Sequence, residues 1–219
     1  VLIPLLAGCC CGPSVEEPSI LLGRHDDAAF APTDVPQPAD VPQVFLDATC
    51  FEVPEAGAEG ALGTNRRLAP DEARDLLVDL RGREDVRIRT APKMLVVSGQ
   101  TGTMFVGDMP NEPPAREQDE SGFDYDMRAA VEAVMVEVTP TVTTNADTIG
   151  LRIRTGNKVE GAPAAIATAD FELEDGGHAL VASDDAVVRD GVRYVFVTVL
   201  RIRSVEPGEI GVDFRGLEE

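Results

Sequence analysis

The segment Ala130–Thr144, AVEAVMVEVTPTVTT, is the longest β-like run in the chain. Its valines are Val131, Val134, Val136, Val138 and Val142. β-Branched residues of this kind favour strands, because they pack well on a pleated surface. Pro140 interrupts the run, and since proline has no N–H to donate to a sheet ladder, we expect a bulge or a sheet edge there.

Similar strand patterns lie on both sides of this run. Thr148–Thr155 alternates apolar and polar residues after the turn Asn145–Asp147. The other segments with strand patterns are Val44–Val53, Val86–Thr90, Lys93–Val97, Thr101–Val106, Ile166–Glu174, His178–Ala182 and Arg193–Val205. Turns are expected at Ser98–Gln100, Asp175–Gly177 and Arg189–Gly191. Val44–Val53 has apolar residues at both odd and even positions. We therefore expect this strand to be buried on much of both faces.

One helix is predicted, at Leu68–Arg81. Pro70 suits the first turn, and an apolar stripe at helical spacing would face the core. Ala56–Arg67 and Met109–Ser121 are rich in Gly or Pro and in polar residues, so we expect loops there. With roughly eight strands, the sequence predicts an α+β fold, mostly β, with an antiparallel or mixed sheet and one packed helix.

The composition excludes several classes of function. The chain has 219 residues and a formal net charge of −20, so it lacks the basic surface that nucleic acids or anionic membranes would require. Hydrophobic residues make up 43%, which is enough for a core, although aromatic residues are only 5%. No apolar stretch reaches the roughly 18 residues that a membrane-spanning helix needs.

The first residues indicate export. The apolar run Val1–Cys9 ends in Leu6-Ala7-Gly8-Cys9, which resembles the bacterial lipobox. That resemblance implies a lipid anchor on the thiol of Cys9; a chance cysteine after an apolar run is the alternative. We therefore predict an export-signal end at residues 1–9, a Pro-rich acidic tether at 10–43, a β-domain at 44–205 and a polar tail at 206–219.

The remaining cysteines and histidines suggest no site. Cys10 and Cys11 are too close to pair comfortably, and Cys50 lies in an apolar strand, where it resembles a small hydrophobe. His25 and His178 are isolated, so we expect no metal site. No Ser/His/Asp arrangement, Cys/His pair or phosphate loop is present, so we expect neither an enzyme nor a cofactor nor a small-molecule substrate.

Charged residues alternate along four of the strands. Three strands carry two arginines each, namely Arg87 and Arg89, Arg152 and Arg154, and Arg201 and Arg203. A fourth strand presents Asp170, Glu172 and Glu174 on one face. We hypothesise that these nine residues form one charged face of a sheet; unrelated solvated faces are the alternative. Calcium at the three acids is a weaker idea, because one straight strand cannot wrap a cation.

Several segments resemble, in order and spacing, the core of the bacterial secretins of type II and type III secretion and type IV pili. The similar segments are Phe51–Val53 (FEV), Thr90–Leu95 (TAPKML), Ser98–Thr101 (SGQT), Phe105–Gly107 (FVG), Val136–Val142 (VEVTPTV), Leu151–Ile153 (LRI), Asp175–Val181 (DGGHALV) and Val195–Ile202 (VFVTVLRI). The resemblance covers most of the predicted β-domain. It implies that copies pair their strands side by side into a double-walled β-barrel ring, which serves as an outer-membrane gate without catalytic residues or cofactor.

The chain also departs from that family. Only the tether precedes the core where members usually carry periplasmic ring domains, and Ala182–Ala186 replaces a Gly-Gly and Val-Pro-x-Leu-Gly pattern. Pro110–Phe123 is acidic where amphipathic hairpins are expected. We therefore expect a secretin-like subunit or accessory lipoprotein, periplasmic and lipid-anchored at the outer membrane, that self-associates or joins a secretion complex. The alternative is a monomeric lipid-anchored binding or adaptor module.

Overall fold

Strand β1 (Gln43–Pro54) lies inside the larger of two sheets in the computed structural model, which describes residues 41–58, 65–142 and 148–205. Its even-numbered residues Val44, Leu46 and Ala48 face the second sheet, whereas Phe51 and Val53 face a helix. The prediction that this strand is buried on both faces is confirmed. A single 3-10 turn (Glu55–Gly57) follows it.

Sheet A has six strands in the order β2-β9-β10-β1, with β3 and β4 sharing the far edge of β1. The bounds are β2 (Arg66–Leu68), β3 (Arg87–Thr90), β4 (Lys93–Val97), β9 (His178–Arg189) and β10 (Val192–Val205). β9 and β10 form a hairpin around Asp190 and Gly191, whose φ angles of 53° and 79° are those of a two-residue turn.

Sheet B has four strands in the order β5-β6-β7-β8. Its bounds are β5 (Gly102–Asp108), β6 (Glu132–Val142), β7 (Thr148–Lys158) and β8 (Ala165–Glu174). Pairing between β5 and β6 stops at Val138, so Pro140 lies where β6 has no strand on that side, and the expected sheet edge is confirmed. Every strand pair in the described residues is antiparallel.

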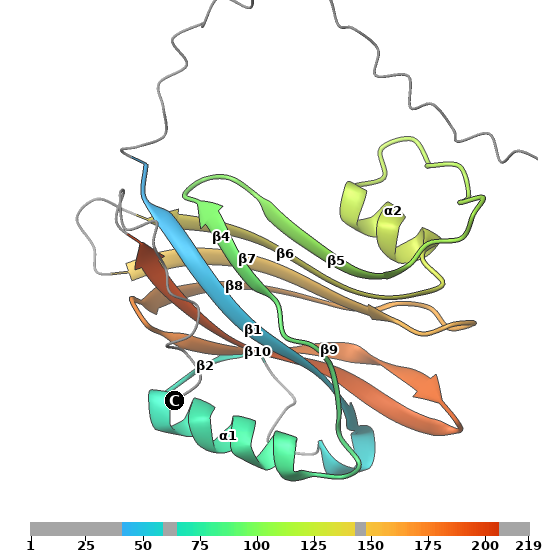
Figure 1. Ribbon diagram of the computed structural model, residues 1–219, viewed down its shortest axis with the longest axis horizontal. Helices are drawn as coiled ribbons and strands as arrows, with labels where there is room; N and C mark the ends of the chain where they lie inside the picture. The colour runs from blue at the N-terminus through green and yellow to red at the C-terminus, as the bar shows by residue number, and fades with distance from the viewer. Residues whose placement is uncertain (1–40, 59–64, 143–147, 206–219) are drawn as a thin grey trace, which may run out of the picture. The chain divides into compact units, whose positions relative to one another are not determined.

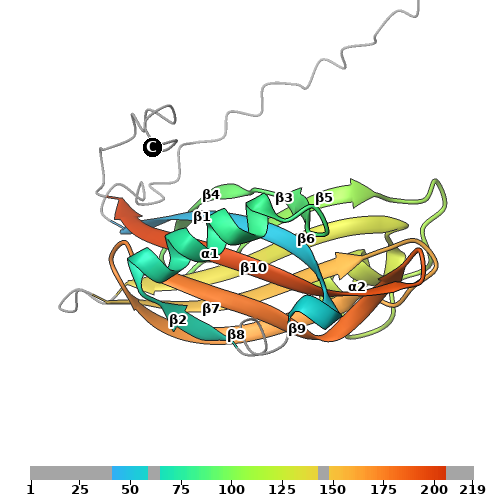
Figure 2. The ribbon, with the colours of Figure 1, turned by 90° about the horizontal axis from the view of Figure 1, so that it is seen from below.

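The two sheets face each other and are covered by one helix each (Figure 1). The main core lies between the sheets, where Leu46, Ile153 and Ile202 are fully buried. Helix α1 (Pro70–Gly82) lies across the outer face of sheet A, as Figure 2 shows, and buries Ala73 and Leu80. Helix α2 (Gly122–Ala129) covers part of the outer face of sheet B.

The structure confirms an α+β, mostly β fold and corrects its details. There are two sheets rather than one, ten strands rather than about eight and two helices rather than one in the described residues. β9 continues beyond Ala182 to Arg189, because the residues 183–185 bulge out opposite Phe196 and the ladder resumes at Ala186. Ser183 stabilises the bulge, since its hydroxyl accepts the N–H of Phe196.

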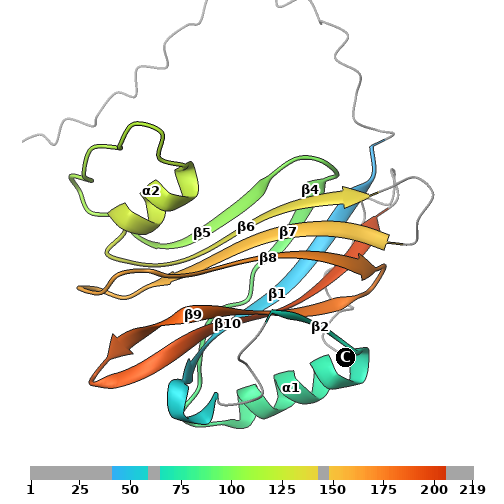
Figure 3. The ribbon, with the colours of Figure 1, turned by 180° about the vertical axis from the view of Figure 1, so that it is seen from behind.

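The described chain crosses between the sheets only at one end, which we call the corner end. One crossing joins β4 to β5 through residues 98–101, and the other joins β8 to β9 through Asp175–Gly177. At the opposite end, which we call the open end, each described connection returns to its own sheet. There the β7–β8 and β9–β10 hairpins point apart (Figure 3).

Candidate functional site

The outer face of sheet B carries five of the nine charged residues singled out in the sequence. Arg152 and Arg154 lie on β7, and the acids Asp170, Glu172 and Glu174 lie on the adjacent strand β8. Arg152 and Asp170 are cross-strand partners, with Nε and Oδ1 2.9 Å apart. Both side chains are about 70% exposed (71% and 68%), so this ion pair stabilises the fold by no more than about 1 kcal/mol.

The other four arginines lie elsewhere. Arg87 and Arg89 belong to β3 in sheet A; Arg89 contacts acids between the sheets, and Arg87 lies over the ring of Tyr194. Arg201 and Arg203 lie on β10 and alternate with residues of the inter-sheet core, so they occupy the outer face of sheet A. The nine residues thus lie in three places, and the hypothesis of one charged face must be reduced to the five on sheet B.

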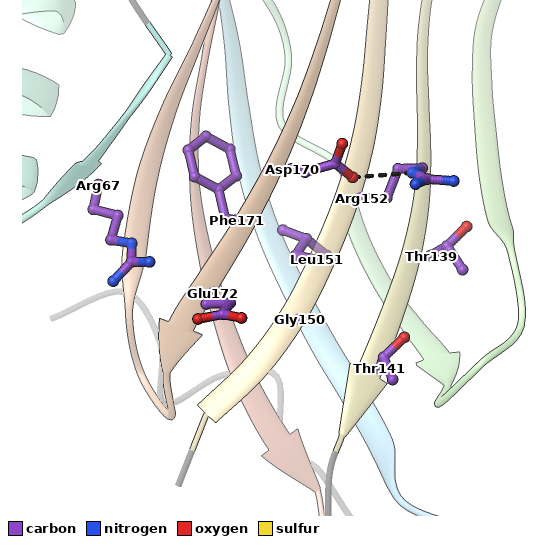
Figure 4. A pocket seen from close by; sticks show the side chains of 9 residues that line it. All are labelled: Arg67, Thr139, Thr141, Gly150, Leu151, Arg152, Asp170, Phe171 and Glu172. Carbon is purple, nitrogen blue, oxygen red and sulfur yellow. Dashed lines mark hydrogen bonds and ion pairs between the residues drawn. The ribbon is translucent and has the colours of Figure 1, made fainter. Parts of the chain in front are cut away.

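A shallow hollow of about 540 Å³ opens on this face of sheet B. Figure 4 shows the residues that line it, which are Arg67, Thr139, Thr141, Gly150, Leu151, Arg152, Asp170, Phe171 and Glu172. Arg67 comes from β2 of the other sheet and lies on the β8 side of the hollow. The lining offers two hydroxyls, two carboxylates and two guanidinium groups in an open setting, which suits a polar protein surface better than an enclosed small molecule.

Helix α2 borders this face and holds Arg154. Asp124 Oδ1 accepts a hydrogen bond from Arg154 Nη2 at 2.6 Å, and the guanidinium lies 4.3 Å from the centre of the Phe123 ring. The Ser121 hydroxyl and then Arg154 lower the pKa of Asp124. Arg154 is only 24% exposed, so it stabilises the helix rather than extending the hollow.

The Pro-rich segment before α2 is tied to the helix by a second ion pair. Glu120 accepts two hydrogen bonds of 2.8 Å from Arg128, which lowers the pKa of Glu120 to about 2. Arg116 and Arg128 both lie near the ring of Tyr125, at 5.9 and 5.7 Å from its centre. Glu120 therefore ties the end of this segment to α2.

A second polar cluster lies between the sheets at the open end, and we call it the inter-sheet charge network. It comprises Glu52, Arg89 and Arg189 from sheet A with Glu132 and Asn157 from sheet B. Glu132 Oε1 lies 2.6 Å from Nη2 of both arginines. Glu52 is fully buried; its Oε1 accepts a 2.9 Å hydrogen bond from Asn157 and lies 3.4 and 3.5 Å from the two guanidinium groups.

The sequence reading missed four members of this network and placed Arg89 on a different surface. One feature of the sequence does indicate it. Glu52 falls in phase with Val44, Leu46, Ala48 and Cys50, which form the buried face of β1, and a carboxylate in such a position needs cationic partners. Hydrogen bonds from Arg189 and Arg89 lower the pKa of Glu132.

The remaining candidate residues have ordinary surroundings or lie outside the described residues. Burial raises the pKa of the Cys50 thiol to about 12, in agreement with its interpretation as a small hydrophobe. His178 is the first residue of β9, where burial and then Arg201 lower its pKa. Cys9, the predicted lipid site, lies outside the described residues, as do His25, Cys10 and Cys11.

Two kinds of feature are absent from the described residues. Within residues 41–58, 65–142 and 148–205, no group of three or more His, Cys, Asp or Glu side chains could hold a metal ion, and this includes the acids of β8. In the same part of the chain neither helix has the length and apolar character to cross a membrane.

Comparisons with known proteins give a faint likeness in structure alone. No family model matches the chain, and no curated protein matches its sequence. Among solved structures, the V. cholerae type IV competence pilus secretin PilQ is 10% identical with a TM-score of 0.35, over 75% of this chain and 61% of that one. The Salmonella SPI-1 type III secretion injectisome secretin InvG is 11% identical with a TM-score of 0.23, over 75% and 57%.

Both of these weak neighbours are secretins. The chain spans about three fifths of the length of each.

Proposed function

We propose that this protein is a secretin-like subunit or accessory lipoprotein of a bacterial secretion or pilus complex in the cell envelope. It acts by joining its sheets to those of identical copies, without catalysis. The proposal rests on one observation: within the described residues, the two outer strands of sheet B, β5 and β8, have no ladder partner on their outer sides. The secretin-like order of segments in the sequence supports the choice of family.

The outer edges of β5 and β8 have no ladder partner in the described residues, although β9 lies close to β8. Among the described residues, β5 pairs only with β6, and β8 pairs only with β7. Asn65 contacts the β8 edge: its Nδ2 donates to the carbonyl oxygen of Thr168 at 3.2 Å. A row of unpaired N–H and C=O groups is a template for another strand.

The directions of the strands permit repetition. Because sheet B has four strands and every pair is antiparallel, β5 and β8 run in opposite directions. β5 of one copy can therefore pair antiparallel with β8 of the next, and copies related by rotation repeat the contact until a ring closes. In sheet A, β9 and β4 lie on opposite sides of β10 and β1 and also run in opposite directions, but β2 pairs with residues 178–180 of β9, so only the rest of β9 could pair with β4 of another copy.

The secretin-like segments also meet in space. At the corner end, the N–H of Gly99 in the Ser-Gly-Gln turn donates to the carbonyl oxygen of Pro140 at 2.7 Å. In the same joint the N–H of Val142 donates to the Ser98 hydroxyl at 2.9 Å. Two segments that resemble the family thus form one joint between the sheets, which supports reading them as parts of a single unit.

The oligomeric state of the protein tests the proposal, when it is compared with that of a variant in which the β8 edge cannot pair. The Thr168 carbonyl points away from β7, and in a strand the N–H of a residue points the same way as its C=O, so Thr168→Pro removes an edge donor without breaking the β7–β8 ladder. We expect the full chain, extracted in detergent, to run as rings or large oligomers, and Thr168→Pro to run as a folded monomer. Thr168→Val keeps the N–H and should assemble.

Native mass measurement and negative-stain imaging give the result, and circular dichroism confirms folding. A monomeric wild-type chain, or a Thr168→Pro variant that assembles normally, would overturn the proposal.

The envelope location is proposed from the N-terminal motif, with Cys9 as the lipid-bearing residue and the outer membrane as the site. Metabolic labelling with a radioactive fatty acid should mark the wild-type chain and Cys10→Ser but not Cys9→Ser. Absence of label from the wild type would remove the anchor from the proposal and leave the assembly untouched.

A monomeric adaptor is the second candidate, and it too has an observation in its favour. β2 already covers residues 178–180 of β9, and Asn65 bridges the two sheets by accepting the N–H of Ala182 while donating to Thr168. Such cover discourages pairing on that side. In this case the hollow on sheet B would be the surface that binds a partner, and a folded wild-type monomer would favour it.

A further inference from the structure

The two sheets are joined to each other by different means at the two ends of the domain. At the corner end the chain itself joins the sheets twice, through residues 98–101 and Asp175–Gly177. At the open end no described segment crosses between the sheets, and the hairpins β7–β8 and β9–β10 point apart (Figures 1 and 3). Non-covalent contacts must therefore close the open end.

The inter-sheet charge network is the contact found there. Glu52, Arg89 and Arg189 all belong to sheet A and together carry one net positive charge. Glu132 supplies the one ionised side chain that sheet B adds to the network, and both arginines donate to its Oε1. The electrostatic attraction between the sheets at this end therefore depends on the charge of a single carboxylate.

The network is incompletely satisfied even with that carboxylate in place. Within the described residues, Glu52 Oε2, Asn157 Oδ1 and the Nε atoms of Arg89 and Arg189 are buried and have no hydrogen-bond partner. Unpaired buried polar atoms disfavour the closed state, because water would satisfy them if the sheets parted. The charge-assisted bonds to Glu132 offset this cost.

Other charged groups surround the network on each element packed against it. Asp108 on β5 is the ladder partner of Glu132, and Lys158 on β7 is that of Ala133. The further charged and titratable neighbours are Arg87 on β3, Asp190 in the β9–β10 turn, Arg128 on α2 and Tyr194 on β10. Arg87 pairs with Asp190, which also acts electrostatically on Arg189, and Lys158 donates to the Arg128 carbonyl oxygen. Among the acids of sheet B in the described residues, Glu132 is the one that forms ion pairs with both Arg89 and Arg189.

We propose that the inter-sheet charge network is a charge-operated clasp: neutralising Glu132 lets the two sheets part at the open end while the corner end stays closed. The inference is independent of whether the protein assembles, because it concerns the inside of one chain. The opening would expose the inner faces of β6 and β9 near Glu132 and Arg189.

Protonation at low pH would neutralise the Glu132 carboxylate. Because its two arginine partners lower the pKa of Glu132 below the ordinary 4.5, the clasp is fully charged above that value and is lost as the pH falls through the lowered one. The open end should accordingly loosen at acidic pH, before the domain unfolds.

Hydrogen exchange on the full chain, read by mass spectrometry, tests the clasp. Glu132→Gln keeps the size and an acceptor oxygen but removes the charge. At neutral pH we expect exchange in residues 132–136 and 186–195 to rise about tenfold, whereas residues 93–104 and 174–181 stay as in the wild type, because local opening is reported separately from global unfolding. Glu137→Gln, on the outer face of the same strand and 4.0 Å from Arg154, is the matched control and should change neither end.

A pH series supplies the second measurement. After correction for intrinsic exchange, the wild type should lose open-end protection in acid, and Glu132→Gln should show no such additional loss. Equal increases at both ends, no increase at the open end, or an acid response that survives in Glu132→Gln would each overturn the proposal.

Discussion

The two helices cover the two sheets by different physical means. α1, with 13 residues, packs on an extended apolar patch of sheet A that includes Phe51, Val197 and Val199. α2, with eight residues, buries Phe123, Met127 and Ala129, and the first two pack with Met135 of sheet B in a small cluster. The first helix thus packs on the larger apolar cluster, whereas the second adds polar contacts to a small one.

The polar contacts of α2 begin at its first turn. The Ser121 hydroxyl accepts the N–H of Asp124 at 3.1 Å, and Asp124 and Arg128 each form an ion pair. By contrast, α1 begins at Ala69, which has no side chain to cap the helix. The comparison teaches that a cap and ion pairs can hold a short helix where a longer one relies on its apolar stripe.

The largest effect is expected at the patch under α1. Phe51 is fully buried between sheet A and the helix, so Phe51→Ala should lower the free energy of unfolding by about 3–5 kcal/mol, through lost burial and a residual cavity. Urea denaturation measures this. Val78→Ala on the exposed side of α1, where the side chain is 67% exposed, is the control and should change it by less than about 0.5 kcal/mol. Equal losses for the two variants would contradict the account of α1.

A smaller loss is expected at α2. Met127 is buried in a space made by Gly156 of β7, where a Cβ atom would lie 2.9 Å from the Met127 methyl. Met127→Ala should cost about 2 kcal/mol, at the low end for such changes because the surrounding cluster is small and can collapse. Denaturant titration again gives the value. A loss as large as that of Phe51→Ala would show that α2 too is held mainly by apolar area.

This difference explains why the sequence predicted α1 and not α2. Ala73, Leu76, Leu77 and Leu80 mark an apolar stripe after a proline, whereas α2 offers only Phe123 and Met127, one turn apart, after an acidic Pro-rich segment. Two apolar residues are too few to establish a helical period. Ser121 at the start, a good N-cap, was the available indication.

The arginine-rich strands show a second limit of sequence reasoning. Val86–Thr90, Leu151–Thr155 and Leu200–Ser204 have nearly the same pattern, and the strands were predicted correctly. Alternation shows which residues share a face, but not which sheet the strand joins or what covers that face. The three arginine pairs therefore lie in different places. Arg87 and Arg89 lie at the inter-sheet space, Arg152 and Arg154 on the outer face of sheet B, and Arg201 and Arg203 on the outer face of sheet A. The order β2-β9-β10-β1 depends on contacts distant in sequence, which one sequence does not reveal.

The N-caps of the two helices allow a reciprocal test, in which we expect moderate changes in the free energy of unfolding. Ser121→Ala removes the hydroxyl that accepts the Asp124 N–H and should cost about 1 kcal/mol. Ala69→Ser adds a cap to α1, where the extended backbone (φ −66°, ψ 150°) suits one, and should gain up to about 1 kcal/mol. Thermal and denaturant unfolding measure both. If Ala69→Ser leaves stability unchanged while Ser121→Ala lowers it, the cap matters only for the helix with little apolar support, which would sharpen the comparison.

The smallest effect concerns the acid titration of Glu120, which ties the segment before α2 to Arg128. Hydrogen bonds from Arg128 lower the pKa of Glu120 from 4.5 to about 2, so this tie is complete above pH 4.5 and is lost only as the pH falls toward 2. Carbon NMR of the side-chain carboxyl should follow that titration in the wild type. In Arg128→Gln the pKa of Glu120 should return toward its ordinary value, while the resonances of α1 stay unchanged because no member of this pair touches it. A Glu120 pKa that does not move in Arg128→Gln would mean that α2 is not held by this ion pair, and its apolar cluster would then have to account for more of its stability.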